Sequence, residues 1–480
     1  MAIQSIIKNI QDIMRKDAGV DGDAQRLSQL VWLLFLKIFD DKEKEYELLD
    51  LKYHSPIPEV LRWRNWASNA EGITGDEMLD FINNKLFKQL KSLKFNENDD
   101  PRGLIVKEVF EDTYNYMKSG TLIRQVVNKI NEIDFNSKDD RHHFNEIYEH
   151  LLKGLQNAGN AGEYYTPRPL TNFIVSTLDP KLGESILDPA CGTGGFLISA
   201  LEYVRSSGEV KTKKDETKVQ QQIRGVELKP LPHLLAITNM ILHGVEIPQQ
   251  IRRGDMLSTP LRDYGPKDRV DIIIANPPFG GSVKDGTEAN FPADFRTKET
   301  ADLFLVLFMS LLKPGGKCGI VLPDGSLFGE GVKSRIKEKL LEECNVHTIV
   351  RLPAGVFQPY AGVNTNLVFF TKGQPTKEVW YYQMPLPAGL KQYTKNRGIT
   401  DAEFEPVIKW FKNKKASDNA WKVSIADIRA KNFNLDFKNP KGAEVEEEFG
   451  SKELVERILG KEEEIKRIIS NLKYKILMLK

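Results

Sequence analysis

The stretch SILDPACGTGGFLISALEYV, residues 185–204, decides the fold of this chain. A short β-rich run is followed by a glycine-rich turn and an amphipathic run, which is typical of a strand, a loop and a helix. Gly192, Gly194 and Gly195 let the backbone turn tightly and approach a ligand without an intervening side chain. Because a helix begins here, free N–H groups and a partial positive charge are directed at the turn. The stretch therefore predicts a ligand site at the end of a strand.

The same alternation of strands and helices continues through residues 157–400. It predicts an α/β domain with an open, mostly parallel sheet and helices on both faces. In such sheets ligands bind at the carboxyl ends of the strands. The predicted strands cover residues 185–187, 223–227, 250–253, 270–275, 318–322, 347–351 and 366–370, and the clearest helices cover 196–204, 230–242 and 301–312.

Residues 1–156 are predicted to form a helical N-terminal domain. Apolar side chains recur with a 3.6-residue period in 3–13 and in 27–38, and a further helix is expected over 143–155. These apolar stripes are interpreted as the core of a helical domain and not as docking surfaces for a partner.

Residues 401–480 form a polar, lysine-rich C-terminal region that ends in a predicted helix over 451–479. Such a helix carries an apolar seam that needs a partner helix, either in this chain or in another. The seam residues recur every seven positions and are Ile458, Ile465, Leu472 and Leu479.

Acidic residues stand at the ends of three consecutive predicted strands. Asp188 and Glu227 end the first and second strands, and Asp255 follows the third. A ligand with an amine, a ribose and an adenine ring would satisfy all three carboxylates. A nicotinamide dinucleotide is disfavoured, because Leu197 stands where its fingerprint has a third glycine. Each acid alone could be a turn or cap residue, but the three in register indicate a binding site.

The fourth predicted strand runs directly into Asn276-Pro277-Pro278-Phe279. Two successive prolines restrict the backbone and remove two N–H donors, which leaves carbonyl groups free to accept hydrogen bonds. The Asn276 side chain adds an amide oxygen beside them, and Phe279 offers a face on which a planar ring can stack. The tetrapeptide is therefore predicted to bind an amino group on a planar ring.

Together, the loop at 188–195 and the corner at 276–279 resemble the amino-methyltransferases that use S-adenosyl-L-methionine. The segments GEYYTPR (162–168) and LPAGVFQPYAGVNT (352–365) narrow the resemblance to the modification subunits of type I restriction–modification systems. The resemblance covers nearly the whole chain. It implies a Rossmann-like methyltransferase domain that transfers a methyl group from S-adenosyl-L-methionine to the N6 atom of adenine in double-stranded DNA.

The family also implies site residues and partners. The matching cofactor contacts are Glu163, Tyr164, Tyr165, Thr166, Pro167, Arg168, Thr193, Gly194, Gly195 and Glu227, to which the strand-end pattern adds Asp188, Gly192 and Asp255. The predicted catalytic residues are Asn276, Pro277, Pro278 and Phe279. In the implied assembly, two modification subunits flank one DNA-specificity subunit, and a restriction subunit can join them.

On this interpretation the adenine must be flipped out of the duplex, at a cost of a few kcal/mol. The Asn276 side chain and the Pro277 carbonyl would accept from its amino group, without a metal or a covalent protein nucleophile. Methylation of a protein glutamine or an RNA base is one alternative, because such enzymes share an Asn-Pro-Pro-aromatic corner. A non-catalytic scaffold that binds the cofactor is another. The tract at 162–168 and the C-terminal seam disfavour the first, and the intact corner disfavours the second.

Charge and composition limit the other possible functions. The chain carries 68 basic and 67 acidic residues. Because binding to many phosphates needs an excess of basic residues, we expect a partner to supply much of the affinity for DNA. No segment approaches the ~20 consecutive apolar residues of a membrane span, and the start lacks a secretory signal. A cytoplasmic protein with no membrane partner is therefore expected. The cysteines number 3 and lie far apart, which disfavours disulfides and a zinc site.

Two further segments are expected to be loops. The polar tract at 206–222 is interpreted as a tolerated loop insertion, with the charged run at 211–218 solvated. Residues 280–300 follow the catalytic corner and lack periodicity, so they are predicted to be mobile until the target base arrives.

Overall fold

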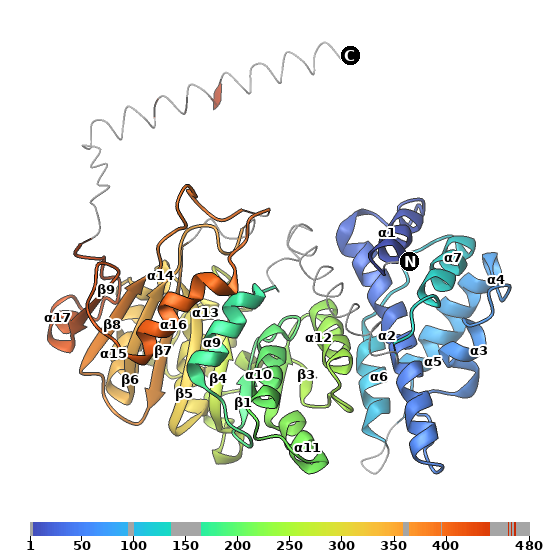
Figure 1. Cartoon of the computed structure of the whole chain (residues 1–480), viewed down its shortest axis with the longest axis horizontal. Helices are drawn as coiled ribbons and strands as arrows, with labels where there is room; N and C mark the ends of the chain where they lie inside the picture. Colours follow the sequence, from blue (N-terminus) through green and yellow to red (C-terminus); the bar gives the residue numbers. More distant parts are fainter. Residues whose placement is uncertain are drawn as a thin grey trace. The chain divides into compact units, whose positions relative to one another are not determined.

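A nine-stranded sheet in the order β3-β2-β1-β4-β5-β7-β6-β8-β9 forms the centre of the fold (Figure 1). The computed structural model describes residues 3–94, 100–135, 165–358, 364–394 and 396–441, together with 459, 462, 465 and 466. Residues 1–437 form one compact unit, and residues 438–480 belong to a second.

The strands on one side of the sheet are parallel to their neighbours. They are β3 (Ile251–Arg253), β2 (Ile223–Glu227), β1 (Ile186–Asp188), β4 (Val270–Ala275) and β5 (Leu312–Pro323). On the other side, β7 (Thr365–Lys372) is antiparallel to both β5 and β6 (Cys344–Arg351). The seven predicted strands are therefore confirmed, and most of the sheet is parallel, as expected.

Two strands lie outside the prediction: β8 (Glu378–Gln383), parallel to β6, and β9 (Ala420–Ser424), antiparallel to β8. Since β9 belongs to the same sheet, the sheet extends beyond the predicted domain boundary at residue 400. The strand is only five residues long and lies in a polar, lysine-rich stretch, so the region as a whole does not resemble a strand. Ala420, Trp421 and Val423 become buried only through tertiary packing.

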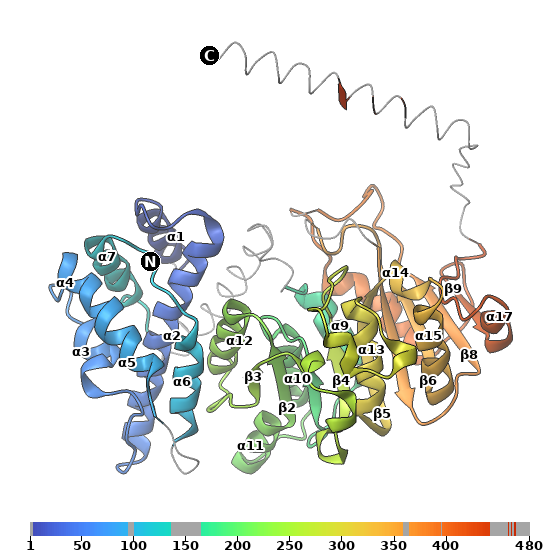
Figure 2. The same ribbon diagram turned by 180° about the vertical axis from the view of Figure 1, so that it is seen from behind.

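Helices cover both faces of the sheet, as predicted (Figures 1 and 2). The helices of one face are α9 (Arg168–Leu178), α10 (Gly195–Ser206), α12 (Pro230–Leu242) and α16 (Glu405–Lys412). Those of the other face include α13 (Thr300–Leu311), α15 (Val332–Glu343) and α17 (Ile425–Ala430). Strand side chains alternate between two apolar cores: Ile272 joins the first and Ile273 the second.

The charged run at 211–218 is not a solvated loop, because helix α11 spans Lys213–Gln222. Thr212 caps this helix: its hydroxyl accepts from the Asp215 N–H at 3.1 Å, and the Asp215 carboxylate accepts from the Thr212 N–H at 3.0 Å. Arg205 of α10 donates to the Glu216 carboxylate, and Val219 is fully buried. The cap, the Arg205–Glu216 ion pair and the burial of Val219 therefore stabilise a helix that the polar composition conceals.

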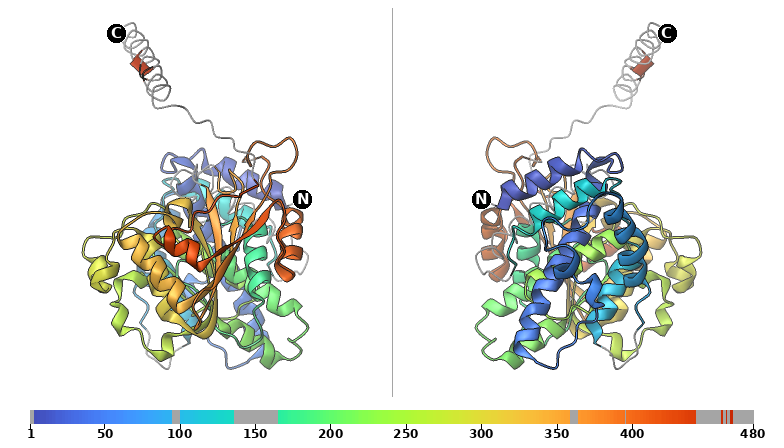
Figure 3. Two further views of the ribbon diagram at one scale, coloured as in Figure 1. Left: turned by 90° about the vertical axis from the view of Figure 1, so that its left-hand side faces the viewer. Right: turned by 90° about the vertical axis from the view of Figure 1, so that its right-hand side faces the viewer.

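The described part of the N-terminal region is helical, as predicted (Figure 3). Its α-helices are α1 (Ile3–Met14), α2 (Gly22–Leu49), α3 (Trp63–Trp66), α4 (Gly75–Asp80), α5 (Phe87–Lys91), α6 (Pro101–Glu111) and α7 (Gly120–Ile130). Helix α2 packs against α12, one of the helices that cover the sheet. Within the N-terminal region, the Trp32 ring of α2 lies edge-on to the Phe87 ring of α5, with ring centres 4.9 Å apart.

The helix expected over 143–155 lies outside the described residues, as does most of the one expected over 451–479. Among the described residues, every helix is too short or too polar to cross a membrane.

Candidate active site

A cavity of about 370 Å³ lies at the carboxyl ends of the parallel strands β1, β2, β3 and β4. Asp188 is the last residue of β1 and Glu227 the last of β2, whereas Asp255 lies two residues after the end of β3 and Asn276 directly follows β4. All four line the cavity. Because neighbouring parallel strands end at the same edge of a sheet, residues spread over 89 positions of the sequence meet in one place. The strand-end reasoning therefore located the cavity correctly.

Most of the glycine-rich turn lines the cavity, but one of its glycines packs against a neighbouring helix. Gly192, Thr193 and Gly195 line the cavity. Gly194 is not among the lining residues; it has a positive φ of 80°, and a Cβ atom there would meet the Met240 side chain of α12 at 3.1 Å. The expectation that Gly194 lets the backbone approach a ligand stays a prediction, and the structure adds a packing constraint at this position. A side chain at this position would be strained, and the Met240 side chain would have to shift by a few tenths of an ångström.

The carboxylate of Glu227 is fixed by the backbone of the turn. Its Oε2 atom accepts from the Gly192 N–H at 2.9 Å, and its Oε1 atom accepts from the Lys229 N–H at 2.7 Å. Each oxygen keeps a further lone pair for a ligand. Only 5% of Glu227 is exposed, and this burial raises the pKa of its carboxyl group.

Asp188 lies close enough to Glu227 for the two acids to influence each other. Burial raises the pKa of the Asp188 carboxyl well above its ordinary range, and the charge of Glu227 raises it further. Two carboxyl groups buried side by side favour a ligand that brings positive charge or hydrogen-bond donors. This is the chemistry of an amine and of ribose hydroxyls.

Asn276 presents a buried acceptor. Its Nδ2 atom donates to the Thr166 hydroxyl at 3.0 Å, across 110 residues of sequence. Its Oδ1 atom is buried and accepts no hydrogen bond from any residue that the structure describes. Leaving an acceptor buried without a partner costs roughly 1–3 kcal/mol, so this oxygen is poised for a donor that the protein does not contain.

The rest of the corner lies partly at the cavity and partly beside it. Pro278 lines the cavity, whereas Pro277 is buried and, like Phe279, is not among the lining residues. The Phe279 ring lies edge-on to Phe357, with ring centres 5.8 Å apart. Phe357 belongs to the segment 352–365, to which the sequence alone assigned no individual roles.

The segment before α9 contributes one residue to the cavity. Thr166 lines it, whereas Tyr165, Pro167 and Arg168 do not. The Arg168 guanidinium donates to the Gly195 carbonyl at 2.8 Å, so it stabilises the turn through this hydrogen bond and does not line the cavity. Glu163 and Tyr164 lie outside the described residues, as do residues 359–363.

Several lining residues escaped the sequence analysis. Leu228, Met256 and Leu257 each follow a predicted acid within two positions, and a ring-binding site needs apolar surface at such places. Their proximity to Glu227 and Asp255 was the available signal. Some of the others lie in stretches that the sequence placed at the site without naming them individually: Pro189, Ala190 and Cys191 in the loop at 188–195, and Gly281, Ser282, Val283, Lys284 and Thr300 in the segment 280–300. No local pattern distinguishes Phe196, Lys229, Gly254 and Phe304.

Comparison with known proteins identifies the family to which this cavity belongs. Residues 139–449 match the family described as N-6 DNA Methylase, and residues 3–130 match the HsdM N-terminal domain. The chain belongs to the N-6 DNA methylase family. The matched ranges include the acids at the strand ends, the corner at 276–279 and the helical N-terminal region.

Individual proteins similar to this chain are subunits of type I restriction enzymes. The methylase subunit of the type I restriction enzyme EcoEI from Escherichia coli is 58% identical over 447 residues, which cover 92% of this chain and 91% of that one. A modification subunit assigned to a type I restriction enzyme of Vibrio vulnificus YJ016 has 43% identity and a TM-score of 0.82, covering 93% of this chain and 98% of that one.

A chain from a structural study of complex assembly in the type I R-M system has a TM-score of 0.83 and 36% identity, covering 98% of this chain and 97% of that one. The prediction of a type I modification subunit with an N6-adenine methyltransferase domain is thereby confirmed.

Proposed function

We propose that this cavity binds S-adenosyl-L-methionine and that Asn276, the Pro277 carbonyl and Phe279 hold a flipped-out adenine of double-stranded DNA beside it. One observation carries the proposal. Asn276, whose Oδ1 atom is buried and has no hydrogen-bond partner among the described residues, lines the same cavity as the buried acids Asp188 and Glu227. An acceptor for an amino group and a site for a cationic ligand therefore share one cavity.

The residues of the cavity fit the proposed cofactor. Glu227, held by two backbone N–H groups, would accept the ribose hydroxyls. Asp188 would lie near the cationic amine, and Asp255 near the adenine amino group. Leu228, Met256 and Leu257 offer apolar surface for the adenine ring. When bound, the cofactor supplies a methyl group that is already activated by a positively charged sulfur atom.

The corner at 276–279 would prepare the target nitrogen. The lone pair of an adenine amino group is delocalised into the ring, so the nitrogen is a poor nucleophile. Hydrogen bonds from that group to Asn276 Oδ1 and to the Pro277 carbonyl favour a more tetrahedral nitrogen. Phe279 would stack on the ring, and positioning would supply much of the acceleration.

We further propose that the chain acts within a complex. Two copies would flank one DNA-specificity subunit, and a restriction subunit could join them. The near balance of 68 basic and 67 acidic residues supports this, because a protein that grips many phosphates alone carries a basic excess. So does the likeness to a chain from the type I R-M system.

Transfer of a tritiated methyl group tests the proposal. The purified chain, with and without its specificity subunit, is incubated with labelled S-adenosyl-L-methionine and unmethylated duplex DNA. We expect label in N6-methyladenine after nuclease digestion, and only when the specificity subunit is present. RNA of the same sequence and a total protein extract serve as parallel substrates. Label in either of these, with none in DNA, would overturn the proposal, and so would cofactor binding without any transfer.

A further inference from the structure

Thr166 contacts the predicted catalytic residue Asn276 directly. The Thr166 hydroxyl receives the hydrogen bond of Asn276 Nδ2 at 3.0 Å, and both residues line the cavity. We infer that Thr166 is a positioning residue, which holds the Asn276 amide with its oxygen directed at the target amino group. The inference rests on the proposed role of Asn276 as the acceptor for that group.

The chemistry of a primary amide explains why it needs such a partner. One end of the Asn276 side chain accepts hydrogen bonds and the other end donates them, and a half-turn about the last bond exchanges the two. With the oxygen inward, the amide accepts from the target amino group. With the nitrogen inward, two N–H donors face each other and the contact is lost. Catalysis therefore depends on which end faces the adenine.

The Thr166 hydroxyl stabilises the productive orientation once the adenine is present. A hydroxyl both donates and accepts, so by itself it tolerates either end of the amide. Between Thr166 and a target amino group, however, only one orientation satisfies both neighbours: Nδ2 toward Thr166 and Oδ1 toward the base. The structure has Nδ2 toward Thr166 and Oδ1 buried without a partner among the described residues.

Thr166 can hold Asn276 only if its own position is fixed. It lies two residues before Arg168, the first residue of α9, and Arg168 donates to the Gly195 carbonyl at 2.8 Å. The Thr171 and Ser199 hydroxyls lie 2.7 Å apart and tie α9 to α10. The segment is thus anchored to the helix that begins at the glycine-rich turn.

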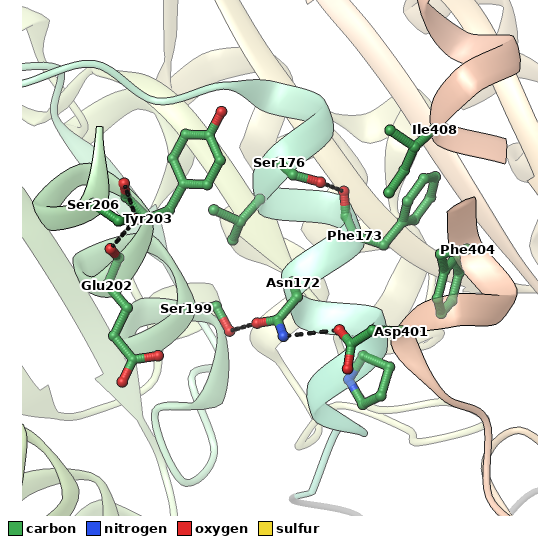
Figure 4. A pocket seen from close by; sticks show the side chains of 12 residues that line it. Asn172, Phe173, Ser176, Ser199, Glu202, Tyr203, Ser206, Asp401, Phe404 and Ile408 are labelled. Atoms are coloured by element: carbon green, nitrogen blue, oxygen red, sulfur yellow. Dashed lines mark hydrogen bonds between the residues drawn. The ribbon is translucent and has the colours of Figure 1, made fainter. Parts of the chain in front are cut away.

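Asn172 links α9 both to α10 and to Asp401, which lies outside these two helices (Figure 4). Its side-chain oxygen accepts from the Ser199 hydroxyl at 2.9 Å, and its Nδ2 atom donates to Asp401 at 3.1 Å. Nearby, the Phe173 and Phe404 rings stack with their centres 4.7 Å apart. Since α9 is held from two sides, Thr166 is placed relative to the turn, and through its hydroxyl it places Asn276 as well.

The test replaces Thr166 by valine, which keeps the shape and removes the hydroxyl, and by serine, which keeps the hydroxyl. The full chain, its specificity subunit and a duplex are assayed in a single turnover at saturating S-adenosyl-L-methionine. We expect Thr166→Val to slow methyl transfer roughly 10- to 100-fold, as misplaced catalytic groups do. Saturating cofactor keeps any loss of cofactor affinity, which calorimetry measures separately, from affecting the rate, and Thr166→Ser should restore most of the rate.

Two controls make the result specific. Thr217→Val makes the same chemical change on the exposed face of α11 and should leave the rate unchanged. Thr166→Ala removes the hydroxyl without requiring an extra methyl group to fit, and should behave like Thr166→Val even if the valine variant folds poorly.

The inference is overturned if Thr166→Val transfers methyl at the wild-type rate, or if its only defect is weaker cofactor binding. It is also overturned if Thr166→Ser is as slow as Thr166→Val. Inactivity of the wild-type complex would instead contradict the proposed function itself, so the two failures are distinguishable.

Discussion

Asn276 and Glu227 line the same cavity, but their hydrogen bonds differ in a way that predicts different roles. Glu227 uses both carboxylate oxygens to hold backbone N–H groups of the turn and of the following helix. Asn276 uses one end of its amide on Thr166 and keeps the other free of partners among the described residues. We therefore expect changes at the two positions to affect different steps.

Asn276→Ala should leave the binding of S-adenosyl-L-methionine nearly unchanged and abolish most of the methyl transfer. Removing a preorganised group from a reaction centre costs roughly 100- to 1000-fold in rate. Calorimetric titration with the cofactor, beside single-turnover transfer, separates the two effects. Asn276→Asp is the matched control, because a carboxylate keeps an acceptor at the same place and should retain more activity than alanine. A large loss of cofactor affinity in folded Asn276→Ala would mean that its role is misassigned.

Glu227→Ala should weaken cofactor binding by about tenfold or more, since a hydrogen bond to a charged group contributes roughly 1.5–3 kcal/mol. The loss includes the support of the turn, because the Gly192 and Lys229 N–H groups lose their acceptor. Glu342→Ala, on the exposed face of α15, is the control for a change of charge and should bind normally. Wild-type affinity in Glu227→Ala would show that the cofactor lies elsewhere.

Among the structural elements, the segment 280–300 connects the corner to α13 and contributes to the cavity through Gly281, Ser282, Val283, Lys284 and Thr300. Its base is closed by two backbone bonds, from the Val283 N–H to the Lys298 carbonyl at 2.9 Å and from the Thr300 N–H to the Gly281 carbonyl at 3.0 Å. Between them the backbone forms only short 3₁₀ turns, Thr287–Asn290 and Ala293–Phe295. The segment is therefore better anchored than a loop without periodicity suggests.

Hydrogen exchange should distinguish the base of this segment from its tip. In the free chain, we expect the amides of Val283 and Thr300 to exchange more slowly than those of 285–297, because short local turns open readily. After addition of cofactor and duplex DNA, with the specificity subunit present, protection should rise at 281–284, which line the cavity. The amides of α15 serve as an internal reference. Strong protection of 285–297 before any DNA is added would contradict a lid-like role.

At the scale of the whole molecule, charge and the C-terminal seam both favour dependence on a partner. The net charge is +1. Of the four seam residues, Ile465 lies among the described residues, and 55% of it is exposed. An apolar stripe that faces water destabilises its helix, so association with helices of another subunit is the expected use of this seam.

The isolated chain should bind DNA weakly and without sequence preference, and should methylate a defined site only with the specificity subunit. Removal of residues 451–480 should impair this assembly and DNA methylation while leaving cofactor affinity unchanged. Size-exclusion profiles and methylation of one duplex, each with full-length and truncated chains, test this. Selective methylation of one sequence by the isolated full-length chain would refute the dependence on a partner.

The sequence by itself determined most of the strands and helices, and it determined that the site lies at the carboxyl edge of the parallel strands. Seven strands and the main helices follow from local periodicity, because side-chain direction repeats every two residues in a strand and every 3.6 in a helix. The meeting of Asp188, Glu227, Asp255 and Asn276 in one place also follows from the sequence. Neighbouring parallel strands end at a common edge, so the position of each residue at the end of its own strand is sufficient to bring the four together.

Tertiary structure alone decided the contacts between elements that are distant in sequence. Strand β9 and helix α11 are marked by a few apolar side chains that become informative only when buried against their neighbours. Gly194 packs close to the Met240 side chain of α12, and Thr166 contacts Asn276 across 110 residues. Periodicity records which face of an element is apolar, but it does not record which other element packs there. That choice depends on the path of the whole chain and on close packing in three dimensions.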